Sequence, residues 1–304
     1  MLPLNAFSSV TIHGLVFKDG VSIPQTFERG ISRHGRINHF EVKSFIRPGG
    51  LPKRPPSNLP PPGNDHLIIM LGDTLGSGRV GTVHQAALLT HNTNLPQLVV
   101  KISRQNRSAY IEQEAWYYEE LEQVQGIAMP RCYGLFRARI EEGTEVKIWG
   151  DDKKGSDKFD QSHSRGFPQA VDSLGEKLPR MPTPDPALLS VLLFERLGGR
   201  MPIQEPIDHI RDDIFEVYND LSRLGIEHLD IRWSNILSVI QDPDYESSGI
   251  VCPNHGRVHQ WRVVDFDLAR KTNGTTVYLD KCTKGWLERL FFGLSNGRII
   301  EPWE

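Results

Sequence analysis

Hydrophobic and polar positions divide the chain into short strand-like runs and a few helical stripes. Apolar, β-branched runs bounded by turn residues predict strands, whereas apolar positions three or four residues apart predict amphipathic helices. The predicted strands cover, in chain order, residues 10–17, 37–46, 66–75, 82–89, 97–103, 131–140, 188–197, 236–240 and 261–269. The predicted helices cover residues 108–124, residues 210–224 and an apolar stripe within residues 286–294. The pattern predicts an α+β fold, with a mainly antiparallel sheet and one long helix before a more helical half.

Two segments interrupt this pattern. Residues 47–65 read RPGGLPKRPPSNLPPPGND, which is too rich in Pro and Gly for a helix or a central strand and predicts an extended linker. Its P-x-x-P motif, Pro52 to Pro55 beside basic residues, could bind a proline-reading domain, although a plain spacer is the simpler interpretation. Residues 141–186 are polar, with too few apolar side chains to offset the entropy cost of ordering, and predict a mobile insertion.

These interruptions predict a division of the chain. Residues 1–65 form an N-terminal extension with short strands and the Pro-rich linker, and residues 66–304 form the main domain. Within that domain, residues 66–196 are expected to form a sheet-rich lobe that contains the insertion. Residues 197–304 are expected to form a second, mainly helical lobe that is unusually short.

Composition and charge narrow the classes of function. At 304 residues with 38% hydrophobic side chains, the chain can bury a full core. A formal net charge of -3 gives no broad basic surface, so we expect neither nucleic acid nor a membrane among the partners. No apolar run reaches the roughly 20 residues of a membrane span, and the N-terminus lacks a signal-peptide pattern. Three scattered cysteines cannot form a disulfide framework, so we expect an intracellular protein, cytoplasmic or nuclear.

The stretch GIEHLDIRWSNIL, residues 225–237, places His228, Asp230 and Asn235 at H-x-D-x-x-x-x-N spacing. Buried polar groups are costly unless they have partners. This polar group within an apolar run therefore either solves a local hydrogen-bonding problem or holds a charged ligand.

The stretch LGSGRVGTV supplies a G-x-G-x-x-G motif at Gly76, Gly78 and Gly81. A glycine cluster alone usually marks a turn, and a dinucleotide-binding fold needs a helix to begin at the third glycine. A strand is predicted after Gly81 instead, so the glycines form the bend of a hairpin. A hairpin tip without side chains lets backbone N–H groups approach phosphate oxygens closely.

Charged residues also lie where an apolar context makes them costly. Lys101, in the apolar strand LVVKIS, needs an anionic partner unless it faces solvent on an edge strand. Glu114 in the following helix is a better candidate partner than Glu112, because apolar positions follow it on the core-facing side. Asp265 follows a β-branched strand, and together with Asn235 it would suffice to bind the magnesium of a nucleotide.

In this order, the glycine motif, the strand lysine, the helix glutamate, H-x-D-x-x-x-x-N and the D-F-x of VVDFDLA resemble the eukaryotic protein kinase superfamily over residues 66–270. The resemblance implies a two-lobed protein-kinase-like fold that uses ATP and Mg²⁺. It also implies transfer of the γ-phosphate to a hydroxyl group, and a serine or threonine of a protein substrate is the expected acceptor.

The resemblance further implies a role for each matching residue. The roles in catalysis are as follows: Asp230 accepts the proton of the substrate hydroxyl, Lys101 contacts the α- and β-phosphates, Glu114 pairs with Lys101, and Arg232 faces the transferring phosphate. The implied Mg²⁺ ligands are Asn235 and Asp265. The implied nucleotide-binding residues are Gly76, Ser77, Gly78, Gly81, Val83, Val99, Lys101, Glu195, Leu197 and Leu237.

The match departs from the family pattern in three places. Leu229 replaces the arginine of H-R-D, so switching by a phosphorylated activation loop is not expected. Asp267 replaces the glycine of D-F-G, which disfavours large backbone flips. No A-P-E follows, and only 35 residues come after Ala269, far fewer than a typical protein kinase uses to bind peptide. Two alternatives therefore stay open: a nucleotide-binding pseudokinase or scaffold, and a small-molecule phosphotransferase similar to aminoglycoside and choline kinases.

One further motif, CPNHGRVH, carries candidate metal ligands outside this set. Cys252, His255 and His259 have a spacing that suits zinc, with Cys282 as a candidate fourth ligand. The alternative interpretation is a polar hairpin tip whose histidines are solvated.

Overall fold

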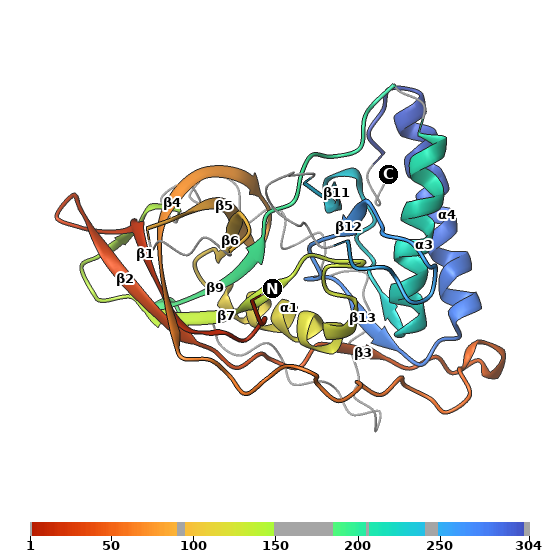
Figure 1. The fold of residues 1–304 in the computed structure, drawn as a ribbon, viewed down its shortest axis with the longest axis horizontal. Helices are drawn as coiled ribbons and strands as arrows, with labels where there is room; N and C mark the ends of the chain where they lie inside the picture. Colours follow the sequence, from red (N-terminus) through yellow and green to blue (C-terminus); the bar gives the residue numbers. More distant parts are fainter. Residues whose placement is uncertain (1, 90–94, 149–184, 205–206, 241–248, 301–304) are drawn as a thin grey trace.

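The computed structural model describes residues 2–89, 95–148, 185–204, 207–240 and 249–300 (Figure 1). The helices within these residues are α1 (Ser108–Glu120), α3 (Asp208–Arg223) and α4 (Thr276–Ser295), with 3₁₀ turns η1 (Lys43–Phe45), η2 (Glu122–Val124) and η4 (Trp233–Asn235). The strands are β1 (Phe7–Lys18), β2 (Val21–Arg29), β3 (Arg36–Asn38), β4 (Asp65–Ser77), β5 (Gly81–Leu88), β6 (Leu98–Ser103), β7 (Cys132–Arg139), β8 (Glu145–Val146), β9 (Leu188–Glu195), β10 (Ile226–Glu227), β11 (Ile236–Ser238), β12 (Trp261–Val263) and β13 (Arg270–Thr272).

Seven strands close into a barrel, which occupies the left-hand part of Figure 1. The hydrogen-bonded order is β2-β7-β9-β6-β5-β4-β1, and a further pairing of β2 with β1 closes the ring. β1 runs parallel to β4, whereas the other neighbouring strands of the ring are antiparallel. The two-residue strand β8 also pairs with β1. Closure gives most of these strands a partner on both edges.

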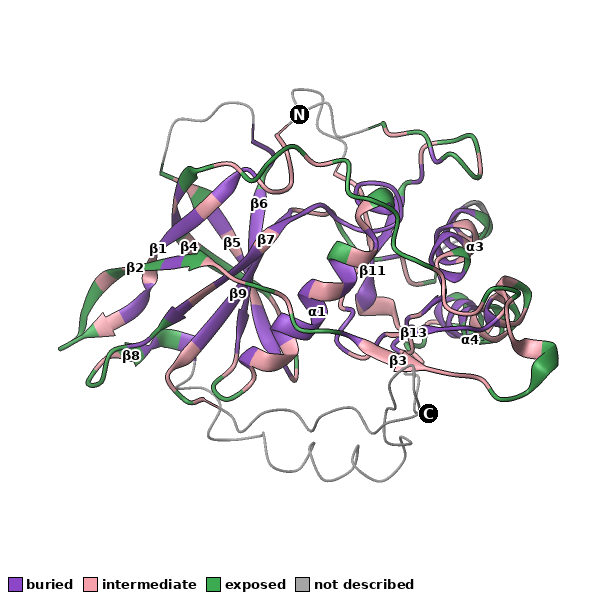
Figure 2. Ribbon diagram, turned by 90° about the horizontal axis from the view of Figure 1, so that it is seen from below, coloured by how far each residue is buried: buried purple, intermediate pink, exposed green. Residues whose placement is uncertain are grey.

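The strands that face α1 are buried on both sides. In β6, alternate residues Leu98, Val100 and Ile102 belong to the core inside the barrel, while Val99 belongs to a second core around α1. Because successive side chains of a strand point to opposite faces, one apolar run serves two cores. Figure 2 shows the barrel strands behind α1 as largely buried. The same alternation places Lys101 on the face that carries Val99, toward α1.

The two-lobed protein-kinase-like fold predicted from the sequence is wrong. The prediction has an antiparallel sheet that begins at residue 66, whereas the structure has a closed barrel that includes β1 and β2. The second half is not mainly helical either, because its described residues contain several short strands in addition to α3 and α4. The hydrophobic pattern of β2 could not reveal that this strand closes the barrel. Most of its side chains are exposed, it contains Pro24, and although it forms a hairpin with the neighbouring β1, its other partner β7 is remote in sequence.

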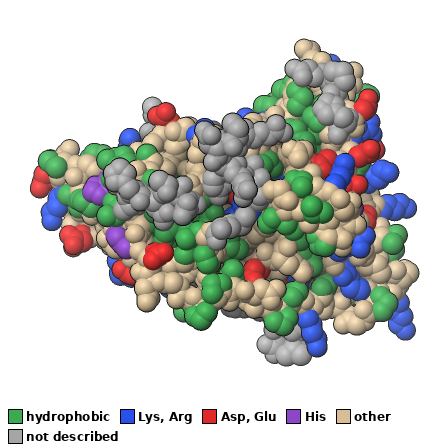
Figure 3. Space-filling view, in the orientation of Figure 1, with side chains coloured by type: hydrophobic (Ala, Val, Ile, Leu, Met, Phe, Trp, Pro, Cys, Tyr) green, Lys and Arg blue, Asp and Glu red, His purple; other side chains and the backbone are tan. Residues whose placement is uncertain are grey.

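The second half packs α3 against α4 beside two small sheets, at the right of Figure 1. One sheet pairs β11 with β12, and the other has the order β10-β13-β3. Ile214 of α3 and Leu287 of α4 belong to the same hydrophobic core as Ile111 of α1. The two halves therefore share one core. Figure 3 shows that Lys and Arg side chains gather along the outer edge of this half, over α3 and α4.

The linker predicted over residues 47–65 has no helix or strand before Asp65, and it crosses the lower side of the molecule in Figure 1. It is held by specific contacts. The Arg47 guanidinium donates to Ser222 O at 2.8 Å, which caps the C-terminal end of α3 with a cation. Farther along, Asn58 N donates to a Glu122 carboxylate oxygen at 3.0 Å. Binding of a proline-reading domain to this segment stays a prediction.

Two other expectations concern segments outside the barrel. The strand predicted over residues 37–46 is reduced to β3 and the turn η1, because residues 39–42 form no ladder. Most of the predicted insertion, residues 149–184, lies outside the described residues. The described helices include none with the length and apolar character needed to cross a bilayer.

Tyr117 joins the N-terminal segment to the second half, and Tyr117→Phe tests this connection. Its fully buried hydroxyl accepts a hydrogen bond from Arg36 N at 2.8 Å and donates one to Ala269 O at 2.5 Å. Removing the hydroxyl leaves buried backbone groups without this partner, so we expect the free energy of unfolding to fall by about 1–3 kcal/mol in urea denaturation. Tyr110→Phe, a half-buried position on the same helix, is the control. Equal losses in the two variants would contradict the assignment.

Candidate active site

A cavity of about 920 Å³ lies between the barrel and the second half. Its volume is within the range of ligand-binding pockets in proteins, which is about 300–1,000 Å³. The cavity wall contains every residue that the sequence assigned to catalysis, metal binding or nucleotide binding, namely Gly76, Ser77, Gly78, Gly81, Val83, Val99, Lys101, Glu114, Glu195, Leu197, Asp230, Arg232, Asn235, Leu237 and Asp265. Residues far apart in the chain therefore line one cavity, which we call the cleft.

Three segments of the cleft wall meet at Lys101. Its Nζ lies 2.6 Å from Glu114 Oε2 and 2.7 Å from Asp265 Oδ1, so β6, α1 and the segment after β12 meet at one ammonium group. Glu112, the rival partner in the sequence, instead forms ion pairs with Arg33 at 3.6 Å and Arg137 at 3.5 Å. The helical register therefore turns Glu114 toward the lysine and Glu112 toward the arginines.

The two loops that carry the aspartates have unusual backbone angles. Leu229 has φ of 63° and Asp265 has φ of 67°, in the left-handed region that residues other than glycine rarely adopt. The His228 ring donates from Nε2 to Val264 O at 3.0 Å and packs edge-on against Phe266, with ring centroids 5.0 Å apart. These contacts hold the strained turns side by side, as is common at functional sites.

Asp230 is almost fully buried and is fixed by two donors. Its Oδ2 accepts hydrogen bonds from Arg232 Nη2 at 2.6 Å and from Asn235 Nδ2 at 2.8 Å. The Arg232 guanidinium also lies 3.9 Å from Asp265 Oδ2, so it bridges two of the acidic side chains. The H-x-D-x-x-x-x-N spacing thus produces a rigid local network, with the carboxylate at the cleft wall.

The three motif glycines have different roles in the β4–β5 hairpin. A Cβ atom at Gly81 would lie 2.4 Å from Ile102 O, so only glycine lets β5 approach β6 this closely. A Cβ atom at Gly76 would have nothing within 4 Å, and one at Gly78 would have its nearest atom 3.8 Å away. The hairpin tip is therefore bare on the side of the cleft, which suits a bulky anionic group such as phosphate.

Arginines fix this hairpin in place. Arg79, at its tip, forms a 2.5 Å ion pair with Asp267, two residues beyond Asp265. Arg104 donates from Nη2 to Ser77 Oγ at 2.7 Å and from Nε to Gly78 O at 2.8 Å. The hairpin is thus tied both to the loop that carries Asp265 and Asp267, which we call the acidic loop, and to the end of β6.

Apolar side chains cover another part of the wall. Val83, Val99, Phe194 and Leu237 all line the cleft, and together they offer flat apolar contact to a base or other ring. Glu195 lies at the same end, but its carboxylate pairs with Arg131 at 2.8 Å. If Glu195 binds a nucleotide, it therefore does so through its backbone, as the sequence resemblance implies.

Burial and neighbouring charges set the ionisation of this group. Burial alone would lower the pKa of Lys101, but Asp265 and Glu114 outweigh it, and the pKa is raised. Burial opposes ionisation of Asp265 too, yet the lysine leaves the pKa of this carboxyl lowered. Burial raises the pKa of Glu114 to about 7 against the opposing effect of Lys101. Burial, and then Asp265, raise the pKa of Asp267 to about 6.

The carboxylates also form a candidate cation site. One oxygen from each of Asp230, Asp265 and Asp267 lies within 4.8 Å of the others. Such carboxylates repel one another, and a hard divalent cation with oxygen ligands would offset that repulsion. The donor set therefore fits Mg²⁺, with the amide of Asn235 in the same wall.

Sequence reasoning gave no role to several residues of the cleft. It treated Asp267 only as a substitution in the family motif, and it did not consider Arg79, Arg104, Arg107 or Arg200, which also line the wall. The signal in the sequence was weak but present, because three of these arginines lie within or just after the glycine hairpin and the lysine strand. Their spacing alone could not show that they turn toward the cleft.

Comparisons with known proteins give little help in interpreting this site. No protein-family model matches the chain, and no curated protein matches its sequence. Among the solved structures that match, one titled "WaaP in complex with acyl carrier protein" is 13% identical, covers 71% of this chain and 69% of that chain, and has a TM-score of 0.36. A likeness this weak does not establish a shared fold.

The raised pKa of Asp267 predicts a pH-dependent effect of Asp267→Asn. A carboxyl whose pKa rises from 3.8 to about 6 on folding contributes stability at low pH that is lost as the pH rises through this range. Because the variant lacks this titration, we expect its free energy of unfolding, relative to the native protein, to increase between about pH 4 and about pH 6. Urea denaturation at several pH values measures the difference.

Asp212→Asn, at an exposed position of α3, corrects for the general effect of removing one negative charge. A relative stability of Asp267→Asn that falls over the same pH range would contradict the prediction. That result would show that the ion pair with Arg79 has a larger effect on the pKa of Asp267 than burial has.

Proposed function

We propose that the protein transfers the γ-phosphate of ATP to a hydroxyl group. The observation that carries this proposal is Lys101, buried between Glu114 and Asp265, with Asp230 in the wall of the same cleft. Phosphoryl transfer depends on positioning and charge neutralisation more than on covalent catalysis. A fixed ammonium, a bare glycine hairpin and a cluster of carboxylates supply those two requirements.

On the phosphate side, Lys101 would contact phosphate oxygens while Glu114 keeps its ammonium oriented. The bare hairpin tip at Gly76 and Gly78 would let the same phosphates approach the backbone closely, with Gly78 N already donating to Gly81 O at 2.9 Å within the hairpin. Mg²⁺, when bound by Asp265 and Asn235, would neutralise the charge that develops on the phosphates. Arg79 and Arg104 hold the hairpin, so little rearrangement is needed to receive a nucleotide.

On the acceptor side, Asp230 would take the proton of the attacking hydroxyl. Both of its hydrogen bonds from Arg232 and Asn235 go to Oδ2, so Oδ1 is the proposed proton acceptor. Arg232 carries a permanent positive charge beside this carboxylate, where it can also attract the transferring phosphate. A base fixed in this way suits general-base catalysis, which requires correct geometry first.

The proposal has two candidate classes of phosphate acceptor. A serine or threonine hydroxyl of a protein is proposed from the sequence resemblance alone. A small-molecule hydroxyl is favoured by the chain that follows Asp265. There β13 is hydrogen-bonded to β10 on one edge and to β3 on the other, so neither edge is open to pair with an added peptide strand.

Asp230→Asn is the sharpest variant for the proposed chemistry, because it keeps the size of the side chain and removes the base. With γ-labelled Mg·ATP, we expect transfer to fall by about 10²–10⁴-fold, while the affinity for ATP changes by less than about tenfold. Asp212→Asn, outside the cleft, should transfer at the native rate. An Asp230→Asn enzyme that retains full activity would exclude Asp230 as the base.

Lys101→Met addresses the nucleotide side. Removing the cation leaves the buried Glu114 carboxylate without its partner and takes the nearest cation from the partly exposed Asp265, which costs up to about 3–5 kcal/mol, so folding must be checked first by circular dichroism. In the folded fraction, we expect ATP binding or turnover to drop by at least about tenfold. Unchanged turnover would remove the lysine from the proposed mechanism. Native protein that binds Mg·ATP but transfers no phosphate to any acceptor would instead support the pseudokinase alternative.

The two acceptor classes can be separated in one assay of ADP release. Native protein and Asp230→Asn are compared with a generic protein acceptor and with a panel of small alcohols that includes aminoglycosides, choline and sugars. Asp230-dependent ADP release with the protein supports the first candidate. Release only with a member of the panel supports the second.

A further inference from the structure

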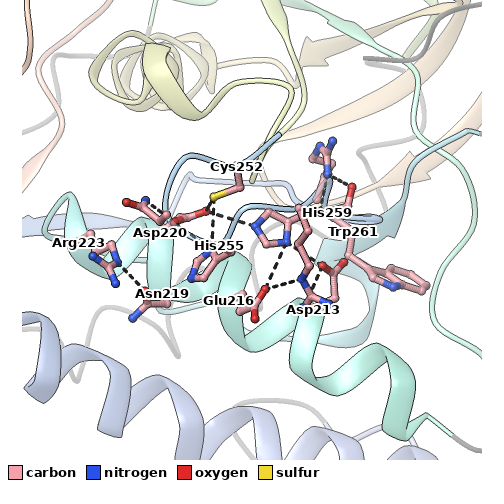
Figure 4. A network of polar contacts seen from close by, with 12 residues as sticks. Asp213, Glu216, Asn219, Asp220, Arg223, Cys252, His255, His259 and Trp261 are labelled. Atoms are coloured by element: carbon pink, nitrogen blue, oxygen red, sulfur yellow. Dashed lines mark hydrogen bonds and ion pairs between the residues drawn. The ribbon is translucent and has the colours of Figure 1, made fainter. Parts of the chain in front are cut away.

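A second cluster of reactive side chains lies outside the cleft, between α3 and the segment that precedes β12 (Figure 4). Asp220 projects from α3, and Cys252, His255 and His259 come from the loop that precedes β12. One ligand atom from each of the four lies within 4.8 Å of the others. The sequence had singled out the cysteine and the two histidines. It gave no sign of Asp220, which replaces Cys282 as the fourth member of the cluster.

Four distances among these atoms are close to the edges of a tetrahedral metal site. Cys252 Sγ lies 3.1 Å from Asp220 Oδ2 and 3.3 Å from His255 Nδ1. Asp220 also has Oδ2 3.5 Å from His259 Nε2 and Oδ1 3.6 Å from His255 Nδ1. With zinc bonds of about 2.0–2.3 Å to sulfur, nitrogen and oxygen, neighbouring ligand atoms of a tetrahedron lie about 3.3–3.6 Å apart.

His259 provides an independent observation that points to a ligand in this group. Its side chain is fully buried, and its Nε2 atom has no hydrogen-bond partner among the described residues. This nitrogen points at the Asp220 carboxylate, which is itself fully buried, at a distance too long for good hydrogen-bond geometry. Buried ring nitrogens without partners are rare and costly. A metal ion between the two groups would satisfy both.

The surrounding residues orient two of the four ligands, His259 and Asp220, as they do in metal sites. His259 donates from Nδ1 to Asp213 Oδ1 at 2.7 Å, which leaves Nε2 as the metal-facing nitrogen. Asn254 donates to Asp220 Oδ1 at 2.7 Å and fixes that carboxylate. A carboxylate behind a ligating histidine is the usual second layer of a zinc site.

The backbone of the loop is also folded to present its ligands. Gly256 N donates to Cys252 O at 2.8 Å, and Cys252 N donates to Arg257 O at 2.8 Å, which closes a tight turn around His255. Gly256 has φ of 66°, a conformation that favours glycine, so the turn is specified by the sequence. The turn brings the cysteine and the first histidine to the same side without help from α3.

We propose that Asp220, Cys252, His255 and His259 bind a structural Zn²⁺ ion. Thiolate and imidazole ligands select zinc over magnesium or calcium. One thiolate, one carboxylate and two neutral imidazoles also balance the charge of the ion, which suits a buried position. Four protein ligands leave no coordination position for a substrate, which is typical of a structural rather than a catalytic site.

The position of the site suggests what the ion holds in place. The loop leads directly into Arg262 of β12, whose buried guanidinium donates to His259 O at 2.8 Å and to Gly126 O at 2.7 Å. Asp265 follows β12 by two residues. A metal that fastens the loop to α3 would therefore also fix the start of the strand that ends at the cleft. The proposal stands whether or not the cleft transfers phosphate.

Metal content of the full-length protein tests the proposal directly. After expression with zinc in the medium, we expect about one zinc per chain by mass spectrometry of the metals. Cobalt(II) exchanged into protein stripped under denaturing conditions should give the visible absorption of a tetrahedral ion, with a thiolate charge-transfer band. Zinc and cobalt below about one tenth per chain would overturn the proposal, because the cluster would then be only a hydrogen-bonded network.

Variants locate the ion. Cys252→Ser and His255→Ala should each lose most of the zinc, and Cys252→Ser should also lose the charge-transfer band. Cys282→Ser removes a cysteine on α4 outside the cluster and should keep both. If the ligand variants are too unstable to purify, cysteine-specific modification of native protein should release zinc in proportion to Cys252 modified. Full zinc retention after loss of Cys252 would overturn the assignment.

Discussion

A lysine ammonium buried between two carboxylates is the interaction on which the site of this protein depends. Charges are costly to bury, and Lys101 is tolerated because Glu114 and Asp265 lie within 2.7 Å of its Nζ. The three residues come from a barrel strand, a helix and the acidic loop, so satisfying one charge fixes the relative position of all three. Asp230 and Asp267 add carboxylates beside Asp265, which suits a divalent cation, while Lys101 and the arginines of the same wall suit a phosphate.

This arrangement requires a strand that is buried on both faces. Val100 and Ile102 fill the barrel, and Lys101 therefore turns outward to α1 and the cleft. Closure of the barrel by β1 and β2 gives the strand a rigid support on the side away from the chemistry. On the opposite side, β13 lies between β10 and β3, which restrains the chain just after Asp267. The acidic loop is thus held from both directions, consistent with its strained backbone at Asp265.

Many residues of the cleft wall could be predicted from the sequence, because they are charged or polar side chains in apolar segments, where burial without a partner is costly. Lys101 in an apolar strand signalled a partner, and the helical pattern was enough to prefer Glu114 to Glu112. The fold could not be predicted in the same way. Barrel closure depends on β2, whose polar face carries no local signal, and on a parallel pairing of β1 with β4 across the linker.

Contacts between distant segments were likewise hidden. The ion pair of Arg79 with Asp267 joins a hairpin tip to an acidic loop, and neither residue indicates the other in sequence. Asp220 is an ordinary acidic residue in a helical pattern until the fold places it against Cys252. The residues that could be predicted are therefore those whose neighbours in the sequence already make their burial costly. The residues that were missed are those whose partners are brought close only by the tertiary structure.

The central claim is that the cleft binds ATP together with a divalent cation, and calorimetric titration tests it most directly. ATP is titrated into the native protein with excess Mg²⁺ and again with EDTA. We expect saturable binding with Mg²⁺ and an affinity lower by at least about tenfold, or 1.4 kcal/mol, without it. Equal affinity under the two conditions, or no binding in either, would contradict the role proposed for Lys101 and the carboxylates around it.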